Sequence, residues 1–156
     1  MSGTRTLKRL LRVLELEEEQ RQTALQSALG DLHRIENAID AAGTRERVGR
    51  KLVNFGILHN EVEDRLAGLE ETRAGSHARE ILIPYRAQAA EIAAVRREEF
   101  LAKRIERRQA ETMIESAEAQ EELENSRRRQ AALDEWFLNR LQAKEAEGEN
   151  SSRKQS

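Results

Sequence analysis

The chain has 156 residues, of which 36% are charged, only 3% are aromatic and none is cysteine, and its net charge is −2. So few large apolar groups cannot fill a thick globular core, and the lack of cysteine excludes a disulfide scaffold and thiolate metal sites. The abundant residues are strong helix formers, and such a composition with near-heptad spacing is typical of long helices or coiled coils. Disorder is the alternative, and the near-cancellation of the charges argues against it.

Residues 4 to about 42 carry the clearest helical pattern, because their apolar side chains recur at steps of three and four. This pattern predicts the narrow seam of a coiled coil, interrupted by one polar layer at Glu18 and Arg21. The a positions are Leu11, Glu18, Leu25, Leu32 and Ile39, and the d positions are Leu7, Leu14, Arg21, Ala28, Ile35 and Ala42.

The next segment, residues 44–72, has helix-forming composition but contains Gly49, Gly56 and Gly68. Each glycine inside a helix costs roughly 1 kcal/mol relative to alanine. This is the weakest helical segment, and the sequence leaves open a kink or local loop near residues 54–60.

The stretch TRAGSHAR, residues 72–79, contains the helix-ending and helix-capping residues expected between two helices. Gly75 can end one helix and Ser76 can cap the next. Pro84 then either kinks the second helix or marks its true start. The remaining chain is helix-like to about residue 147, and the small polar tail at 148–156 is predicted to be disordered.

These elements predict an all-α fold: a single long antiparallel two-helix coiled-coil hairpin over residues 4–147. Arm one covers about 4–72, the turn about 73–77 and arm two about 77–147. The near-equal length of the arms favours the hairpin over two helices that splay or pair with other chains.

The stretch ALDEWFLNRL, residues 132–141, gathers the largest apolar groups of the chain around its single tryptophan, Trp136. At 100° per residue the apolar side chains span an arc of about 200°, which is wider than a two-helix seam. The equal-arm hairpin places this stretch opposite residues 7–16. Exposed apolar groups at that end predict a partner-binding surface. The alternative is that they clamp the fraying helix ends together.

No catalytic constellation is present in the sequence. The histidines His33, His59 and His77 have neither HExxH spacing nor a neighbouring cysteine, and no phosphate-binding glycine motif occurs. We therefore expect no catalytic residues, no metal site, no cofactor and no enzymatic activity.

Two basic clusters, at 45–51 and 127–129, are offset by acidic neighbours, which argues against a nucleic-acid partner. Arg5, Lys8, Arg9 and Arg12 give the first helix a basic face, which is compatible with peripheral membrane contact at most. No run reaches eighteen apolar residues and no secretory signal is recognisable, so the expected compartment is the cytoplasm.

Three stretches give the chain a resemblance to a known family: LKRLLRVLELEEEQRQTAL near the start, then EEFLAKRIERRQAETMIE and RRRQAALDEWFLNR. Together with the predicted hairpin they resemble the stalk proteins of type III export ATPases. These are the FliJ family of flagella and the YscO-type proteins of injectisomes. The resemblance covers most of residues 4–145, and it does not distinguish a flagellar from an injectisome system.

The resemblance implies a non-catalytic role in protein export. Such stalks insert into a hexameric ATPase ring, promote its assembly and activity, link it to the export gate, and are proposed to handle export chaperones. They act in the cytoplasm or at the cytoplasmic face of the inner membrane. The implied ring-facing residues are Leu7, Lys8, Leu11, Arg12, Leu14, Trp136, Phe137, Leu138, Arg140 and Leu141. The implied gate-facing residues, at the tip of the hairpin, are Leu66, Leu69, His77 and Ile81.

One competing function remains open. The chain could be a structural coiled-coil spacer or scaffold that self-associates through its apolar open end. A client-gripping chaperone is a weaker alternative, because a two-helix seam offers no cleft.

Overall fold

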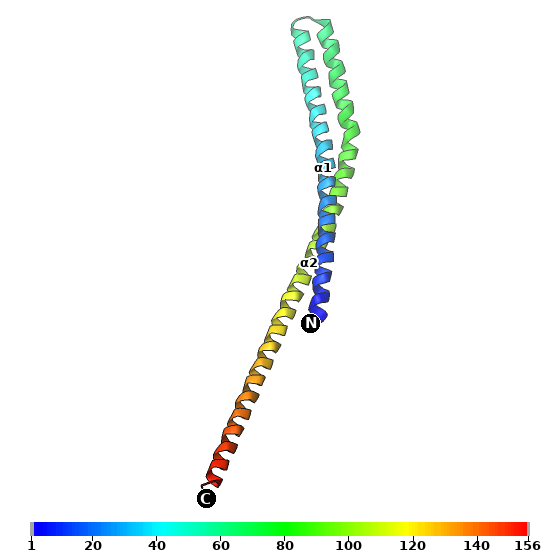
Figure 1. The fold of residues 1–156 in the computed structure, drawn as a ribbon. Helices are drawn as coiled ribbons and strands as arrows, with labels where there is room; N and C mark the ends of the chain where they lie inside the picture. The colour runs from blue at the N-terminus through cyan, green and yellow to red at the C-terminus, as the bar shows by residue number, and fades with distance from the viewer. Residues whose placement is uncertain (1, 156) are drawn as a thin grey trace. The chain divides into compact units, whose positions relative to one another are not determined.

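The computed structural model describes residues 2–155, which form two helices joined by a short turn, α1 (Ser2–Leu58) and α2 (Val62–Arg153) (Figure 1). No strand is present in this range. The prediction of an all-α helical hairpin is therefore confirmed. Two units make up the chain: one contains residues 12–107, and the other contains the first turns of α1 together with α2 from residue 108 onward.

The turn lies at residues 59–61, so the prediction of a turn at 73–77 is wrong. Asn60 adopts the left-handed conformation with φ of 56°, and the Glu61 amide donates a hydrogen bond to the Gly56 carbonyl at 2.9 Å. This is the Schellman pattern that ends helices, and asparagine is one of the few residues that tolerate it. The two helices are consequently unequal, with 57 and 92 residues, in place of the predicted arms 4–72 and 77–147.

Gly75, the residue expected to end a helix, lies buried inside α2. A Cβ atom built on it would stand 2.6 Å from the Ala42 carbonyl oxygen and 2.8 Å from the Glu46 amide nitrogen. Glycine is required here because the two backbones approach closely, and not because the chain reverses direction.

The same close approach continues toward the turn at Gly49 and Gly68. A Cβ on Gly68 would stand 2.6 Å from the Gly49 oxygen and 2.7 Å from the Val53 amide nitrogen, and a Cβ on Gly49 would stand 2.6 Å from the Thr72 nitrogen. Small residues at a helix interface permit this backbone contact. The glycines that weaken the isolated helix therefore make its packing possible.

Pro84 neither breaks α2 nor marks its start, since the helix continues on both sides of it. A proline inside a helix removes one backbone hydrogen bond, and this exposed position tolerates the loss. Residues 148–153 are the last turns of α2. Disorder of the tail stays a prediction.

Cross-helix contacts fix the register within each unit. In the unit of residues 12–107, Arg79 contacts Glu46 at 3.4 Å and Arg21 contacts Glu99 at 3.2 Å. In the other unit, Lys8 pairs with Glu118 at 2.6 Å. Residues 7 and 8 thus lie against α2 near residue 118, and their predicted position opposite 133–141 is wrong because the turn comes earlier in the chain.

The predicted seam itself is correct, because all eleven a and d positions are buried or half-buried. The polar layer has partners on the facing helix, since Glu18 binds Arg107 and Arg21 binds Glu99. The core is a thin line dominated by alanine, as expected for two helices in close contact. The buried apolar residues are Leu14, Ala28, Ala42, Ala89 and Ala93 in the unit of residues 12–107, and Ala110 and Ile114 in the other unit.

Candidate interaction surfaces

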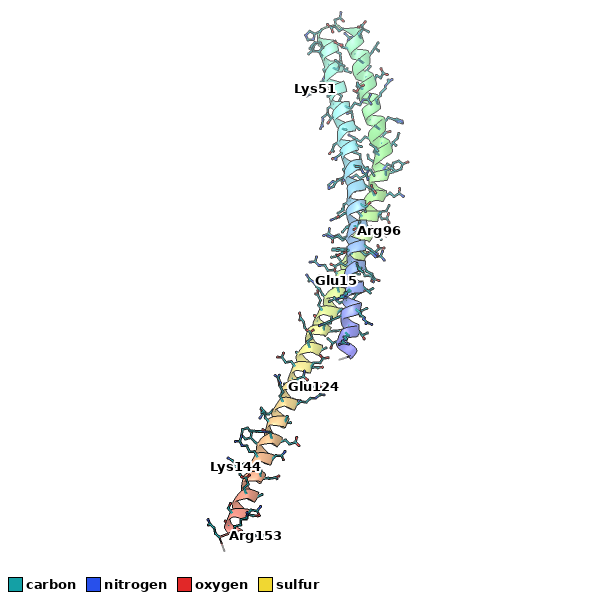
Figure 2. The ribbon with its side chains drawn as sticks, viewed as in Figure 1. Glu15, Lys51, Arg96, Glu124, Lys144 and Arg153 are labelled. Carbon is teal, nitrogen blue, oxygen red and sulfur yellow. The ribbon has the colours of Figure 1, made fainter. Side chains whose placement is uncertain are left out.

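The most open part of the chain is the C-terminal stretch, which we define as residues 122–153 of α2. Every residue in this stretch is exposed, and its side chains project outward from a single helix (Figure 2). Its one ion pair to a charged neighbour, Arg128 with Glu124 at 4.0 Å, is local to the helix. No other segment of the described chain covers these residues, so their apolar groups are available to a partner.

The large apolar groups of this stretch form an aromatic cluster. The rings of Trp136 and Phe137 meet edge to face, with centroids 5.1 Å apart and an interplanar angle of 77°. The Arg140 guanidinium lies 5.0 Å from the centroid of the Trp136 ring, within cation–π range. Trp136 remains 51% exposed and Phe137 58%. These contacts hold the cluster in place without hiding it.

Leu133, Leu138 and Leu141 complete the apolar surface and are also more than half exposed. Tryptophan, phenylalanine and arginine together are the residue types that anchor protein interfaces. The predicted C-terminal residues are therefore all exposed on one helix, where they form a candidate docking surface.

The N-terminal members of the predicted ring-facing set have different environments. Leu7 and Leu11 are half-buried and Leu14 is buried, so all three belong to the seam of the hairpin. Lys8 is held by Glu118, and Arg12 is exposed. The register separates these residues from the aromatic cluster, because Lys8 lies against residue 118 and not against residues 133–141.

The predicted gate-facing residues all lie on α2 and are exposed. Leu66 and Leu69 follow the turn closely, within about 12 Å along the helix. His77 and Ile81 lie farther along, at roughly 24 Å and 30 Å from the turn. Only the first two are therefore tip residues in the observed hairpin, because the turn precedes the predicted one.

The turn is held by a network that sequence reasoning missed. Arg65 donates from Nε to the Gly56 carbonyl at 3.2 Å and from its terminal nitrogen to the Asn60 side-chain oxygen at 3.0 Å. The His59 ring stacks on Phe55 with centroids 4.1 Å apart. The arrangement explains His59 as a structural residue of the turn.

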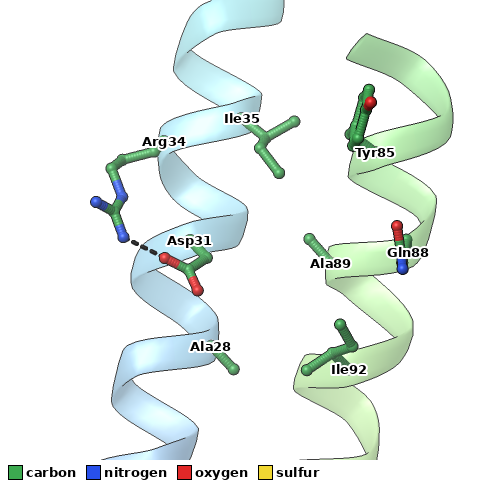
Figure 3. Close-up of a pocket in the computed structure, with 8 residues that line it drawn as sticks. All are labelled: Ala28, Asp31, Arg34, Ile35, Tyr85, Gln88, Ala89 and Ile92. Atoms are coloured by element: carbon green, nitrogen blue, oxygen red, sulfur yellow. Dashed lines mark hydrogen bonds and ion pairs between the residues drawn. The ribbon is translucent and has the colours of Figure 1, made fainter.

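A groove in the unit of residues 12–107 was also missed by sequence reasoning (Figure 3). Its volume is about 420 Å³, and its lining includes the buried Ala28 and Ala89 together with larger apolar side chains. The rim includes the exposed Tyr85 and the local ion pair of Arg34 with Asp31. No signal along the sequence predicts this groove, because it depends on which alanines face each other across the two helices. The groove is lined by Ala28, Asp31, Arg34, Ile35, Tyr85, Gln88, Ala89 and Ile92.

Among the residues whose side chains the structure describes, one carboxylate is buried. Glu46 is 7% exposed and is bound by Arg50 of its own helix and by Arg79 of α2. A buried carboxylate with two ion-pair partners has a structural role, whereas an unpaired one would be a candidate catalytic group.

Charged groups across the seam also perturb one another. A hydrogen bond to Glu17 at 2.9 Å and another to Glu106 at 3.0 Å raise the pKa of Lys103. Near the turn, hydrogen bonds from Arg45 lower the pKa of Glu71. All of these groups are partners in ion pairs, which accounts for the shifts without a catalytic role.

Over residues 2–155 no group of three or more histidine or acidic side chains could hold a metal ion. Within the same range, neither helix offers a stretch long and apolar enough to cross a membrane. The chain matches no family model, no curated protein and no solved structure.

Proposed function

We propose that this protein is the non-catalytic central stalk of a type III protein-export ATPase. On this proposal it inserts into the hexameric ring, promotes ring assembly and ATP turnover, and couples the ring to the export gate. The observation that carries the proposal is the aromatic cluster of Trp136 and Phe137, displayed on a single helix that no other segment of residues 2–155 covers. The resemblance of three sequence stretches to the stalk family supplies the identity of the partner.

The ring-facing surface is then the C-terminal stretch alone. Trp136, Phe137, Leu138 and Leu141 supply apolar contact area, and Arg140 adds a positive charge for acidic groups of the ring. Leu7, Leu11 and Leu14 contribute by holding α1 against α2, since they lie in the seam. On the same proposal Leu66 and Leu69 face the export gate, and export chaperones are further partners.

The test uses the single tryptophan as a reporter. Purified protein is titrated with the export ATPase of the same genome, in a tryptophan-free form of that ATPase, while Trp136 emission and ATP turnover are followed. We expect a saturable blue shift together with faster ATP turnover, because Trp136 enters a dry interface. If Trp136 emission does not shift and ATP turnover does not change, the stalk function is rejected.

A pair of matched variants assigns the surface. Phe137→Ser removes a 58% exposed aromatic from the cluster, and Ile105→Ser removes a 57% exposed residue elsewhere on α2. We expect Phe137→Ser to weaken ATPase binding roughly 30-fold, as for an interface anchor, and Ile105→Ser to leave it unchanged. Both should unfold within about 0.5 kcal/mol of the parent protein, because exposed residues contribute little to stability. If Leu69→Ala and Ile81→Ala abolished binding while Phe137→Ser did not, the orientation would be the reverse.

The alternative function is a structural scaffold without an ATPase. The exposure of the same apolar side chains also supports it, because an uncovered apolar surface can bind a second copy. The response of ATP turnover separates the two functions, since a scaffold would leave it unchanged.

A further inference from the structure

The C-terminal stretch has a charge pattern that the proposed function does not use. A basic block, Arg127 to Arg129, precedes the aromatic cluster, and an acidic block containing Glu145, Glu147 and Glu149 follows it. Both blocks lie on an exposed helix that no other segment of the described chain covers. The two blocks stand at nearly equal distances from Phe137, on either side of it.

The apolar residues between the blocks are arranged in the same symmetrical way. Leu133 and Leu141 stand four residues before and four residues after Phe137, so the three share one stripe of the helix. All three are more than half exposed. The stripe therefore reads the same in both chain directions, which is what pairing with an antiparallel copy requires.

The charged residues lie beside this stripe. At 100° per residue, Arg127, Arg129, Glu145 and Glu147 all fall about 80° to one side or the other of Phe137. In an antiparallel pair centred on Phe137, the basic block of each copy lies beside the acidic block of the other. In a parallel pair each block lies beside the same block of the other chain, and the like charges repel each other.

We propose that the C-terminal stretch binds a second copy of itself as an antiparallel helix pair, with its two-fold axis close to Phe137. The stripe Leu133–Phe137–Leu141 forms the apolar centre, and the basic and acidic blocks pair at both ends. This proposal rests on the sequence and exposure of the stretch and is independent of the ATPase partner. If the stalk function also holds, the dimer covers the same aromatic cluster and is a resting form that the ATPase displaces.

The first experiment measures the mass of the full-length protein by sedimentation over a range of concentrations. Two helices of about six turns form an interface at the small end of the stable range, so we expect dissociation in the micromolar range. Added salt should weaken the dimer by screening the paired blocks. A protein that stays monomeric at about 100 µM in low salt would overturn the proposal.

Charge-reversal variants test the pairing of the blocks. One variant carries Arg127→Glu with Arg129→Glu, and the other carries Glu145→Arg with Glu147→Arg. Each alone places like charges side by side, and we expect its dimer to weaken at least tenfold, by roughly 1.4 kcal/mol. An equimolar mixture brings opposite charges together at both ends and should dimerise like the parent protein. If the mixture dimerises no more tightly than either variant alone, this pairing of the blocks is excluded.

Cysteine variants test the direction, since the chain has no cysteine of its own. Leu133→Cys and Leu141→Cys are mixed and treated with a short thiol-reactive cross-linker. We expect cross-linked dimers in the mixture and little in either variant alone, because residue 133 of one copy lies near residue 141 of the other. Cross-linking of each variant with itself would instead show a parallel pair and overturn the antiparallel arrangement.

Discussion

The region next to the turn and the C-terminal stretch are built from similar helix-forming residues, yet one is closely packed and the other is fully open. Next to the turn, Ala42, Gly49 and Gly56 recur every seven residues on α1, and Gly68 and Gly75 do so on α2. These small residues let the backbones touch. The C-terminal stretch instead carries bulky apolar groups that no helix of the described chain covers. The size of the side chains on the interacting face, more than helix propensity, therefore distinguishes the packed segment from the segment available for binding.

The largest effect should come from adding a methyl group at the closest contact. Gly68→Ala places a Cβ 2.6 Å from the Gly49 oxygen and 2.7 Å from the Val53 nitrogen, and these backbone atoms cannot rotate away. We expect a loss of about 1–3 kcal/mol in the free energy of unfolding, as for an overpacked core. Urea unfolding followed by circular dichroism measures it.

Gly30→Ala is the matched control, because the added Cβ has no atom within 4 Å apart from its chain neighbours and the adjoining backbone of its own helix. Here the ordinary helix preference applies, and we expect a gain of about 0.5–1 kcal/mol. A loss of stability at Gly68 and a gain at Gly30 from the same substitution would show that close backbone packing is confined to the region next to the turn. A gain at Gly68 as well would mean that the two backbones are not in contact in solution.

An intermediate effect is expected at the turn. Asn60→Val puts a β-branched residue at φ of 56°, which costs roughly 1–2 kcal/mol because the Cβ crowds the following carbonyl. Asn60→Gly is the control, since it also loses the hydrogen bond from Arg65 but accepts this backbone conformation. Thermal unfolding of the two variants isolates the conformational cost. Equal stability of the two would place the turn elsewhere, as at residues 73–77.

The seam was predictable from the sequence because its heptad positions are filled by leucine, isoleucine and alanine. The turn was predictable only as an open alternative, a loop near residues 54–60, because Gly75 and Ser76 match the local chemistry of a helix boundary, whereas Asn60 gives a weaker local signal. The position of the turn is decided by a contact between backbones that are distant in sequence. Local turn and cap residues do not indicate such a contact. The seven-residue spacing of Gly49 and Gly56 was the signal in the sequence for that contact.

The candidate site was predictable only in part, for a related reason. The apolar arc around Trp136 is a property of one helix, so its excess over a two-helix seam can be counted along the chain. Its position relative to Leu7 depends on the register, and the register depends on the turn. The groove beside Tyr85 depends on which alanines face each other, so it too required the register.

The smallest expected effect is a pH response confined to the packed region. Arg45 joins Glu71 across the two helices, with hydrogen bonds of 2.6 and 3.0 Å, and lowers the pKa of Glu71 below its ordinary value of 4.5. A lowered pKa in the folded state means that this pair stabilises the fold above pH 4.5, and the contribution is lost as the pH falls through the lowered pKa. Glu71→Gln should therefore lower the thermal midpoint slightly at neutral pH and leave it unchanged in strong acid. Glu124→Gln, in the C-terminal stretch, should have no such effect, because its partner Arg128 lies on the same helix. An equal response from both variants would show that cross-helix pairing adds nothing beyond surface charge.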